Sequence, residues 1–309
     1  MDKLILGMLL ACALLATKEG RGQRSASTDI RDTLHQNGQT RTYRLHVPAG
    51  LLDSTKVLPL VIALHGGGGS GQQFATQSKW SEKADREGFM VVYPDGWQNP
   101  GVLGLRTWNA GGCCGQIASV QHTDDVGFIR KLIDKLVTQY RIDARRVYAT
   151  GHSNGAMLCY RLACELSDKV AAIAPNAGTM QVQTPCNPER VMPILHIHSK
   201  QDQNVPYRGG VGTKGISGHW NPSVDSTLAV FANLAGCSAQ KQSVQSTDSY
   251  VHYQWLACQK GADIQYYLTN DGGHSWPGGI QTRFASDMPS QAFVNNDLIW
   301  RFFKTRSLP

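Results

Sequence analysis

One serine stands between two glycines at a point where a strand is expected to turn directly into a helix. Residues 150–157 read TGHSNGAM, which places Ser153 at the centre of a G-x-S-x-G pattern. The strand-like run VYAT precedes it, and residues 154–166 carry apolar side chains at helical spacing. A turn this tight projects the serine hydroxyl above the strand ends, and the flanking glycines avoid collisions with neighbouring backbone. The pattern predicts a nucleophile, because the start of a helix also favours a developing negative charge.

A serine hydroxyl needs a base to take its proton, and three later histidines are candidates for that base. His274 lies in DGGHSWPGG, directly after a predicted strand at 264–268, where a loop can reach the turn at Ser153. His219 lies in a polar insertion and His252 in an alternating stretch, so both are expected to be surface or packing residues. We therefore expect His274 to be the base.

An acidic side chain must in turn orient the base. Asp202 closely follows the apolar run 193–198, so it is expected in a loop at the carboxyl edge of a sheet. Asp271 precedes His274 by three positions and is the reserve candidate, although it is expected to shape the turn. The chain order of serine, acid and histidine then matches the order typical of this strand–turn–helix arrangement.

A glycine-rich stretch, HGGGGSG, follows another predicted strand at residues 58–64. Backbone without side chains can lie against a carbonyl group, and we expect the Gly67 amide to form an oxyanion hole with the amide of Asn154. A phosphate cradle is the alternative, but the stretch lacks the Gly-Lys-Ser/Thr ending of a P-loop. His65, which begins the stretch, is expected to be a structural residue of the loop.

The elements that must position these residues are apolar, β-rich runs with helical stretches between many of them. This pattern predicts an α/β fold with a mainly parallel central sheet flanked by helices. We expect one catalytic domain over residues 26–309, because no linker or repeat interrupts the pattern. The expected strands are 42–47, 58–64, 89–93, 147–150, 170–174, 193–198 and 264–268, and the expected helices are 124–140, 154–166, 223–234 and 290–304.

Residues 1–25 are predicted to be a signal peptide and a disordered N-terminus. The apolar run 4–16 is shorter than the roughly 20 residues that span a bilayer, so no transmembrane segment is expected. The run contains Cys12 in a loose lipoprotein-like context, which keeps lipid anchoring as a minor alternative. The expected location is therefore secreted or periplasmic.

Seven cysteines remain outside that segment, and in an exported protein they indicate disulfides with one thiol left over. Cys237 and Cys258 flank a hairpin-like stretch and are predicted to be bridged. Cys113 and Cys114 are adjacent, so at least one of them is expected to pair elsewhere. No C-x-x-C pair is present and no histidine stands at zinc spacing from a cysteine, so no metal is expected. The pairing of the other cysteines is left open: Cys159, Cys164 and Cys186.

Composition indicates a globular protein, with 41% hydrophobic and 17% charged residues. The formal net charge of +7 is spread along the chain, whereas nucleic-acid binding usually needs a concentrated basic face. We therefore expect no nucleic-acid partner. The sequence leaves the oligomeric state open.

Six segments in this order resemble the polyhydroxybutyrate depolymerase-like and feruloyl esterase-like branch of the α/β-hydrolases. They are LHGGGGSG, WNAGGCCG, DDVGFIRKLID, GHSNGAM, HIHSKQDQNVPY and GGHSWPGG, and the resemblance covers about residues 41–303. It implies an α/β-hydrolase fold and a secreted serine esterase with Ser153 as nucleophile, Asp202 as acid and His274 as base. It agrees with the roles expected from the residues themselves.

The expected reaction is hydrolysis of carboxylic esters through an acyl-enzyme, without a metal or cofactor. The expected substrates are small or oligomeric esters, including feruloyl or other short acyl esters of plant polysaccharide. Trp108 and Trp276 lie in motif loops and are expected to line the acyl site, where an aromatic wall suits a phenolic group. The alternatives are a depolymerase of polyhydroxybutyrate or another polyester, an acetylxylan esterase, a peptidase of the same fold, and a non-catalytic binding protein.

Overall fold

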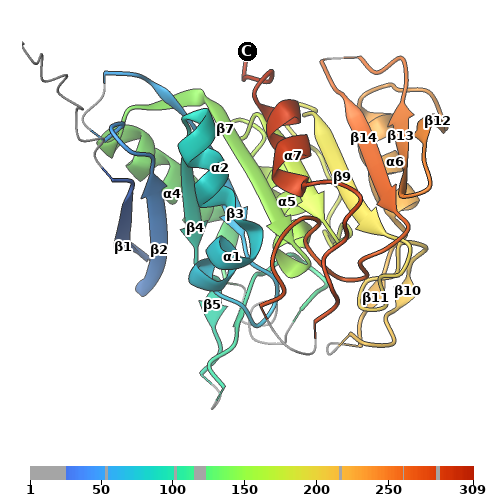
Figure 1. Ribbon diagram of the computed structural model, residues 1–309, viewed down its shortest axis with the longest axis horizontal. Coiled ribbons are helices and arrows are strands. Elements are labelled where there is room, and N and C mark those ends of the chain that lie inside the picture. Colours follow the sequence, from blue (N-terminus) through green and yellow to red (C-terminus); the bar gives the residue numbers. More distant parts are fainter. Residues whose placement is uncertain are drawn as a thin grey trace, which may run out of the picture.

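A ten-stranded sheet runs through the molecule (Figure 1). The computed structural model describes residues 26–52, 55–100, 103–114, 123–215, 218–259, 261–282 and 286–309. The strand order is β1-β2-β4-β3-β7-β8-β9-β14-β13-β12. The predicted signal segment 1–25 and Cys12 lie outside the described residues. No helix within the described ranges has the length and apolar character needed to cross a membrane.

The six central strands are parallel, and antiparallel strands extend the sheet at both edges. Parallel order places the carboxyl ends of the central strands at one edge, where ligand sites of open α/β sheets form. The central strands are β4 (Met90–Pro94), β3 (Leu58–Leu64), β7 (Ile142–His152), β8 (Ala172–Asn176), β9 (Ile194–Ser199) and β14 (Ile264–Thr269). The antiparallel strands are β1 (Thr28–Gln36), β2 (Gln39–Val47), β12 (Lys241–Ser246) and β13 (Tyr250–Trp255).

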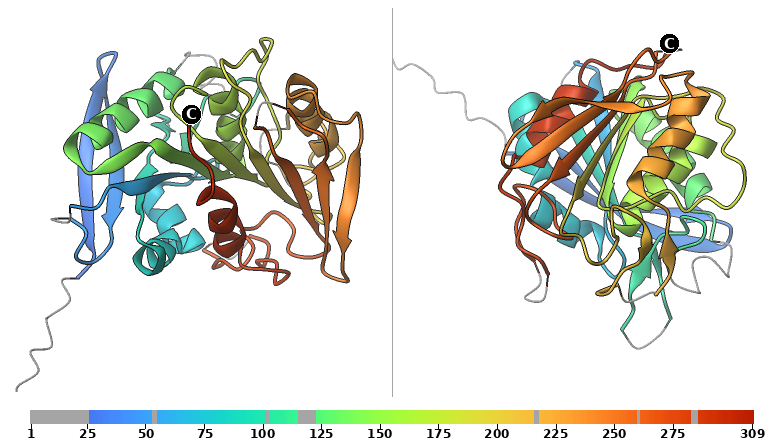
Figure 2. Two further views of the ribbon diagram at one scale, coloured as in Figure 1. Left: turned by 90° about the horizontal axis from the view of Figure 1, so that it is seen from above. Right: turned by 90° about the vertical axis from the view of Figure 1, so that its right-hand side faces the viewer.

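Helices cover both faces of this sheet, as two views at right angles show (Figure 2). On one face lie α1 (Gly71–Ser78), α2 (Trp80–Glu87) and α7 (Asn295–Phe303). On the other lie α4 (Asp125–Gln139), α5 (Asn154–Glu165) and α6 (Val224–Leu234). Two short hairpins lie apart from the main sheet: β5 (Trp97–Gln98) with β6 (Arg106–Thr107), and β10 (Gly210–Val211) with β11 (Trp220–Asn221).

The core is divided into two apolar layers by the alternation of side chains along the strands. In β3, Leu60 and Ile62 pack in the layer under α4, α5 and α6, whereas Val61 and Ala63 pack in the layer under α1, α2 and α7. All seven residues of β3 are buried. A strand buried on both faces reads as a continuous apolar run, which is why the sequence predicted this strand correctly.

Several element boundaries differ from those expected. The last helix begins at Asn295 instead of residue 290, because Ser290 and Gln291 hydrogen-bond to Asp271 in the preceding loop. Helices α1 and α2 were not predicted, since each has eight residues and only Lys79, at φ 57°, separates them. Strand β1, whose burial alternates at the sheet edge, was not predicted either.

The turn between β7 and α5 packs directly against the end of β3. A side chain at Gly155 would begin 2.6 Å from the carbonyl oxygen of His65 and closer still to that of Leu64. A side chain at Gly151 would begin 2.6 Å from the carbonyl carbon of Gly155. Both glycines are therefore required by backbone contact, as the sequence pattern predicted.

Replacing Gly155 by alanine should lower the free energy of unfolding by about 1–3 kcal/mol, because backbone must shift to admit the methyl group. This cost exceeds the helix preference for alanine over glycine, about 1 kcal/mol. Gly67→Ala is the matched control, since its methyl group would make only an ordinary 3.7 Å contact. Urea unfolding of both variants measures the difference, and equal stabilities would contradict the packing argument.

Candidate active site

Ser153 occupies the turn between β7 and α5, where its backbone adopts φ 56° and ψ −121°. Residues with side chains rarely adopt a positive φ, so the surroundings must hold the turn in place. The amide of Ser153 donates to the carbonyl oxygen of Asn176, at 2.9 Å, at the end of the neighbouring strand β8. The serine is thereby fixed at the carboxyl edge of the sheet.

The three side chains predicted as nucleophile, base and acid meet in one hydrogen-bonded chain. His274 Nε2 lies 2.9 Å from Ser153 Oγ, and His274 Nδ1 lies 2.8 Å from Asp202 Oδ2. Ser153 follows β7, Asp202 follows β9 and His274 follows β14, so three parallel strands deliver them to one edge. This geometry suits the removal of a proton from the serine hydroxyl.

The charges in this chain are strongly coupled. Burial alone would raise the pKa of Asp202, but the nearby charge of His274 and hydrogen bonds from His198 and His274 bring it well below its usual range. Burial alone would lower the pKa of His274, but the charge and hydrogen bond of Asp202 raise it above the ordinary histidine value of 6.5. Asp202 is therefore ionised and is placed to stabilise a protonated His274.

The loop after β9 holds the Asp202 carboxylate through its own backbone. Asp202 Oδ1 accepts hydrogen bonds from the amides of Asn204, at 2.9 Å, and Val205, at 2.8 Å. His198 Nε2 lies 2.8 Å from the carbonyl oxygen of Val205 and 3.3 Å from Asp202 Oδ2. Both carboxylate oxygens are thus occupied by donors, which fixes the orientation of the acid.

A buried row of hydrogen bonds extends from this loop into α5. Since the Val205 carbonyl can only accept, His198 donates to it from Nε2, and His198 Nδ1 lies 3.0 Å from His196 Nε2. His196 Nδ1 lies 2.6 Å from the Tyr160 hydroxyl. Burial lowers the pKa of His196 well below its usual value, so this ring is neutral. Sequence reasoning missed the row; two histidines in the apolar strand ILHIHS were the available signal.

Two further residues position the base loop and were also missed. The Asn176 side-chain amide donates to the carbonyl oxygen of Ser275 and to His152 Nδ1, each at 2.9 Å. Asp287 Oδ2 accepts the backbone amide of His274 at 2.7 Å. Asp287 lies in an irregular loop after His274, where no periodic pattern marks it.

The two amides predicted as an oxyanion hole lie next to each other. A side chain added at Gly67 would make its nearest contact with the Asn154 side chain, 3.7 Å away. Among the described residues, neither backbone N–H has a hydrogen-bond acceptor. The Asn154 side chain is held by the backbone of Trp108, accepting from its amide at 2.7 Å and donating to its carbonyl at 3.1 Å. The two residues expected to form the oxyanion hole are therefore neighbours, as that role requires.

The prediction that Trp108 and Trp276 line the cleft is wrong. Both are buried in the core, with 0% and 1% of their surface exposed. The indole of Trp108 donates to the His65 carbonyl oxygen at 2.9 Å, and that of Trp276 donates to Asn296 Oδ1 at 3.1 Å. Trp108 thus links the glycine-rich loop to Asn154, and both rings support the site loops from within.

A pocket of about 640 Å³ opens over Ser153 and His274. His219, expected at the surface or in packing, also lines it, because the insertion that carries it folds back over the site. The apolar part of the wall consists of Phe74, Leu105, Cys114, Met157 and Val205. These side chains, rather than the tryptophans, form a wall suited to an apolar acyl group.

The reserve acid and the predicted disulfide lie away from the reacting groups. Asp271 accepts hydrogen bonds from the Ser290 hydroxyl and, at 2.9 Å, from the Gln291 amide, so it shapes the loop. Cys237 and Cys258 are joined, with an S–S distance of 2.06 Å, on either side of the β12–β13 hairpin.

The expectation for the adjacent cysteines was wrong, because Cys113 and Cys114 are joined to each other. Cys164 is bridged to Cys186, and the remaining described thiol, Cys159, is buried in the core layer under α5. Cys113 packs near the pocket in a separate cluster with Ala110, Met157 and Val205.

Comparison with known proteins identifies relatives of this chain. Residues 41–211 match the family described as "Esterase PHB depolymerase". The chain is 28% identical over 268 residues to a bifunctional acetylxylan esterase/xylanase of Neocallimastix patriciarum, covering 86% of this chain and 35% of that protein. It is 30% identical over 228 residues to feruloyl esterase B of Piromyces equi, covering 71% and 40%. The chain therefore spans well under half the length of these two relatives.

A solved structure, the acetyl xylan esterase from Aspergillus awamori, superposes with a TM-score of 0.58 at 15% identity, covering 89% of this chain and 99% of that one. At this identity the similarity is one of fold, and it confirms the predicted α/β-hydrolase architecture. The family match covers more than half of the sequence. This chain belongs to the esterase PHB depolymerase family.

Proposed function

We propose that this protein is a serine carboxylic-ester hydrolase that works through an acyl-enzyme. The observation that carries the proposal is the chain Ser153–His274–Asp202 beside the free amides of Gly67 and Asn154. His274 takes the hydroxyl proton as Ser153 Oγ attacks the ester carbonyl carbon. The two amides donate to the resulting oxyanion, which exists only in the tetrahedral state and so is stabilised selectively.

The bond to the leaving alcohol then breaks, and the proton held by His274 passes to the alcohol oxygen. Water enters, gives a proton to His274 and attacks the acyl carbon, and Ser153 recovers its proton when the acid leaves. Throughout, Asp202 carries the balancing charge for the histidinium. No step requires a metal ion or a cofactor.

The substrates we propose are feruloyl or other short acyl esters of plant polysaccharide. A volume of about 640 Å³ and an apolar wall can hold a planar phenolic acyl group, which an acetyl-sized site would exclude. The relative from Piromyces equi, a feruloyl esterase, supports this class.

Two alternative substrates each have one observation in their favour. The family description names a polyhydroxybutyrate depolymerase, which favours a polyester. The Neocallimastix relative and the Aspergillus structure are acetylxylan esterases, which favours acetylated xylan. Turnover of methyl ferulate, acetylated xylan and hydroxybutyrate oligomers by the same preparation ranks the three classes.

Export from the cytoplasm is part of the proposal. The apolar run 4–16 suits a secretory signal, and disulfides such as Cys164–Cys186 and Cys237–Cys258 persist in oxidising compartments. Mass spectrometry of the N-terminus of protein recovered outside the cytoplasm tests it, and an uncleaved chain retained inside would contradict it.

Ser153→Ala should reduce ester hydrolysis by about three orders of magnitude or more, because the chain of three side chains acts as a unit. It should also abolish covalent labelling by a fluorophosphonate, read as a mass increase on the peptide containing Ser153. Ser243→Ala, on exposed strand β12, is the matched control and should keep both properties. A Ser153→Ala protein with a tenth of the original activity would remove this residue from the mechanism.

The rate should fall as pH drops through the pKa of His274, because only the neutral ring accepts the serine proton. Asp202 raises that pKa, so the acid limb of kcat/KM should have its midpoint above the ordinary value of 6.5. Asp202→Asn should lower the midpoint and reduce kcat by about 10³–10⁴-fold. The control is Asp271→Asn, which should leave the midpoint unchanged. A shifted midpoint in Asp271→Asn together with an unchanged midpoint in Asp202→Asn would show that Asp271 is the acid.

Leu105→Ala should lower kcat/KM for methyl ferulate by about 3–10-fold. This is the loss expected when an acyl group no longer covers part of an aliphatic side chain. The kcat/KM for an acetyl ester should change less than twofold, because an acetyl group is too small to contact Leu105. Leu103, 80% exposed, offers the control Leu103→Ala. Equal losses on both substrates would show that Leu105 does not contact the acyl group.

A further inference from the structure

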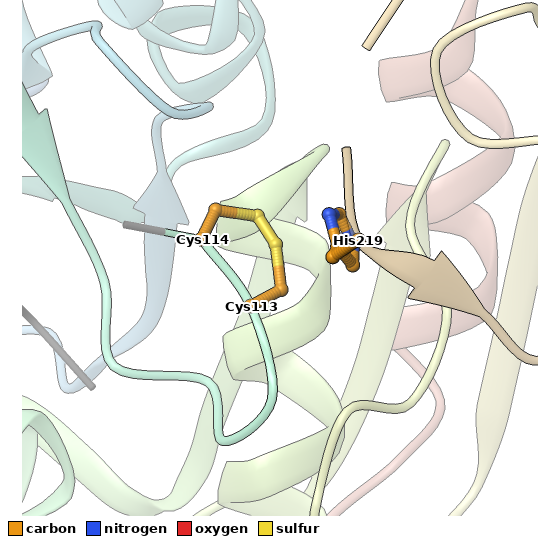
Figure 3. A group of neighbouring side chains, drawn as sticks. All are labelled: Cys113, Cys114 and His219. Carbon is orange, nitrogen blue, oxygen red and sulfur yellow. A yellow bond between two sulfur atoms is a disulfide. The ribbon is translucent and has the colours of Figure 1, made fainter. Parts of the chain in front are cut away.

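Three potential metal ligands meet at the wall of the pocket. The sulfurs of Cys113 and Cys114 and a ring nitrogen of His219 all lie within 4.8 Å of one another (Figure 3). Cys114 and His219 line the pocket that contains Ser153. Among the described residues, no other group of three such side chains brings its ligand atoms this close.

Hydrogen bonds outside the disulfide hold the two segments together. The Gly112 amide donates to the Gln181 carbonyl at 2.8 Å, and the Gln181 side chain donates to Asn221 Oδ1 at 3.2 Å. The Asn221 side chain in turn donates to the carbonyl oxygen of His219 at 3.4 Å. Gln181 and Asn221 are both buried. The two cysteines and the histidine therefore stay neighbours whether or not the sulfurs are bonded.

The sulfurs are also placed by packing. Cys113 packs with Ala110, Met157 and Val205, and Cys114 Sγ lies 3.8 Å from Met157 Sδ. Two thiolates and a neutral imidazole are a ligand set that Zn²⁺ prefers. Sulfurs joined to each other cannot act as thiolates, so the ligand set exists only after the disulfide is reduced.

We propose that reduction of the Cys113–Cys114 disulfide creates a binding site for Zn²⁺ or a similarly thiophilic divalent cation, with His219 as the third ligand. A dithiol supplies the two electrons and two protons: the S–S bond breaks, two thiols form, and the dithiol becomes a cyclic disulfide. The cation then displaces the two thiol protons and binds both sulfurs and one ring nitrogen. Water completes the coordination.

The location of the site gives it a consequence for catalysis, and this part rests on the proposed function. A cation held by Cys114 and His219 would occupy the wall of the pocket over Ser153. Acyl groups that use this wall would be excluded while the cation is bound. The reduced, metal-bound protein is therefore an inhibited form, and oxidation or chelation restores the open pocket.

The test uses the whole protein, reduced with a phosphine and desalted without oxygen. Co²⁺ reports thiolate binding by near-ultraviolet charge-transfer absorption, and competition with Zn²⁺ gives the zinc affinity. We expect about one equivalent to bind the reduced protein and none the oxidised protein. His219→Ala should weaken zinc binding by at least about tenfold, whereas His252→Ala, a half-buried histidine on β13, should not.

A double variant, Cys113→Ser with Cys114→Ser, controls for the other cysteines, which it leaves intact. Binding that persists in this variant, or equal affinities for the two histidine variants, would overturn the proposal. If the double variant does not fold, the comparison of His219→Ala with His252→Ala decides alone. Metal binding is read without substrate, so a protein that binds zinc but hydrolyses no ester would refute the proposed function and leave the site standing.

Discussion

The contact between the turn at Ser153 and the end of β3 is the constraint on which the rest of the site depends. Backbone packs on backbone there, because a side chain at Gly155 would overlap the carbonyl groups of Leu64 and His65. The contact sets the distance between the nucleophile and the glycine-rich loop that β3 feeds. Sheet packing thereby places the turn that carries Ser153 and Asn154 next to the glycine-rich loop that carries Gly67. Trp108 then locks the same two segments through His65 and Asn154.

Around Asp202, the constraint is to keep a buried carboxylate ionised. Asp202 is buried, yet two backbone amides and His274 donate to it, and His198 lies close by. Behind it, a buried row of hydrogen bonds runs from His198 through His196 to the Tyr160 hydroxyl. A preorganised environment of this kind costs no rearrangement at the moment of reaction.

The parts that followed from sequence were those in which a local pattern coincides with a tertiary constraint. Strand β3 is a continuous apolar run because both its faces are buried, and Ser153 lies between glycines because backbone packs on both sides. Asp202 and His274 could be located because each follows a strand of the parallel sheet. A residue's position in a motif near the site, by contrast, does not predict the direction of its side chain. The ring of Trp108 is buried beneath the glycine-rich loop, where its N–H donates to the carbonyl oxygen of His65.

The distances along the chain between Ser153, Asp202 and His274 bear on when the proposed site forms during folding. His274 lies 72 positions from Asp202 and 121 from Ser153. Closing loops of this length costs chain entropy that only the completed sheet can offset, so partly folded chains lack the triad however much helix or strand they contain. The hydrogen-bonded chain of Ser153, His274 and Asp202 thus forms only when β7, β9 and β14 are all in register. On the proposed function, newly made protein hydrolyses no ester until the whole sheet has assembled.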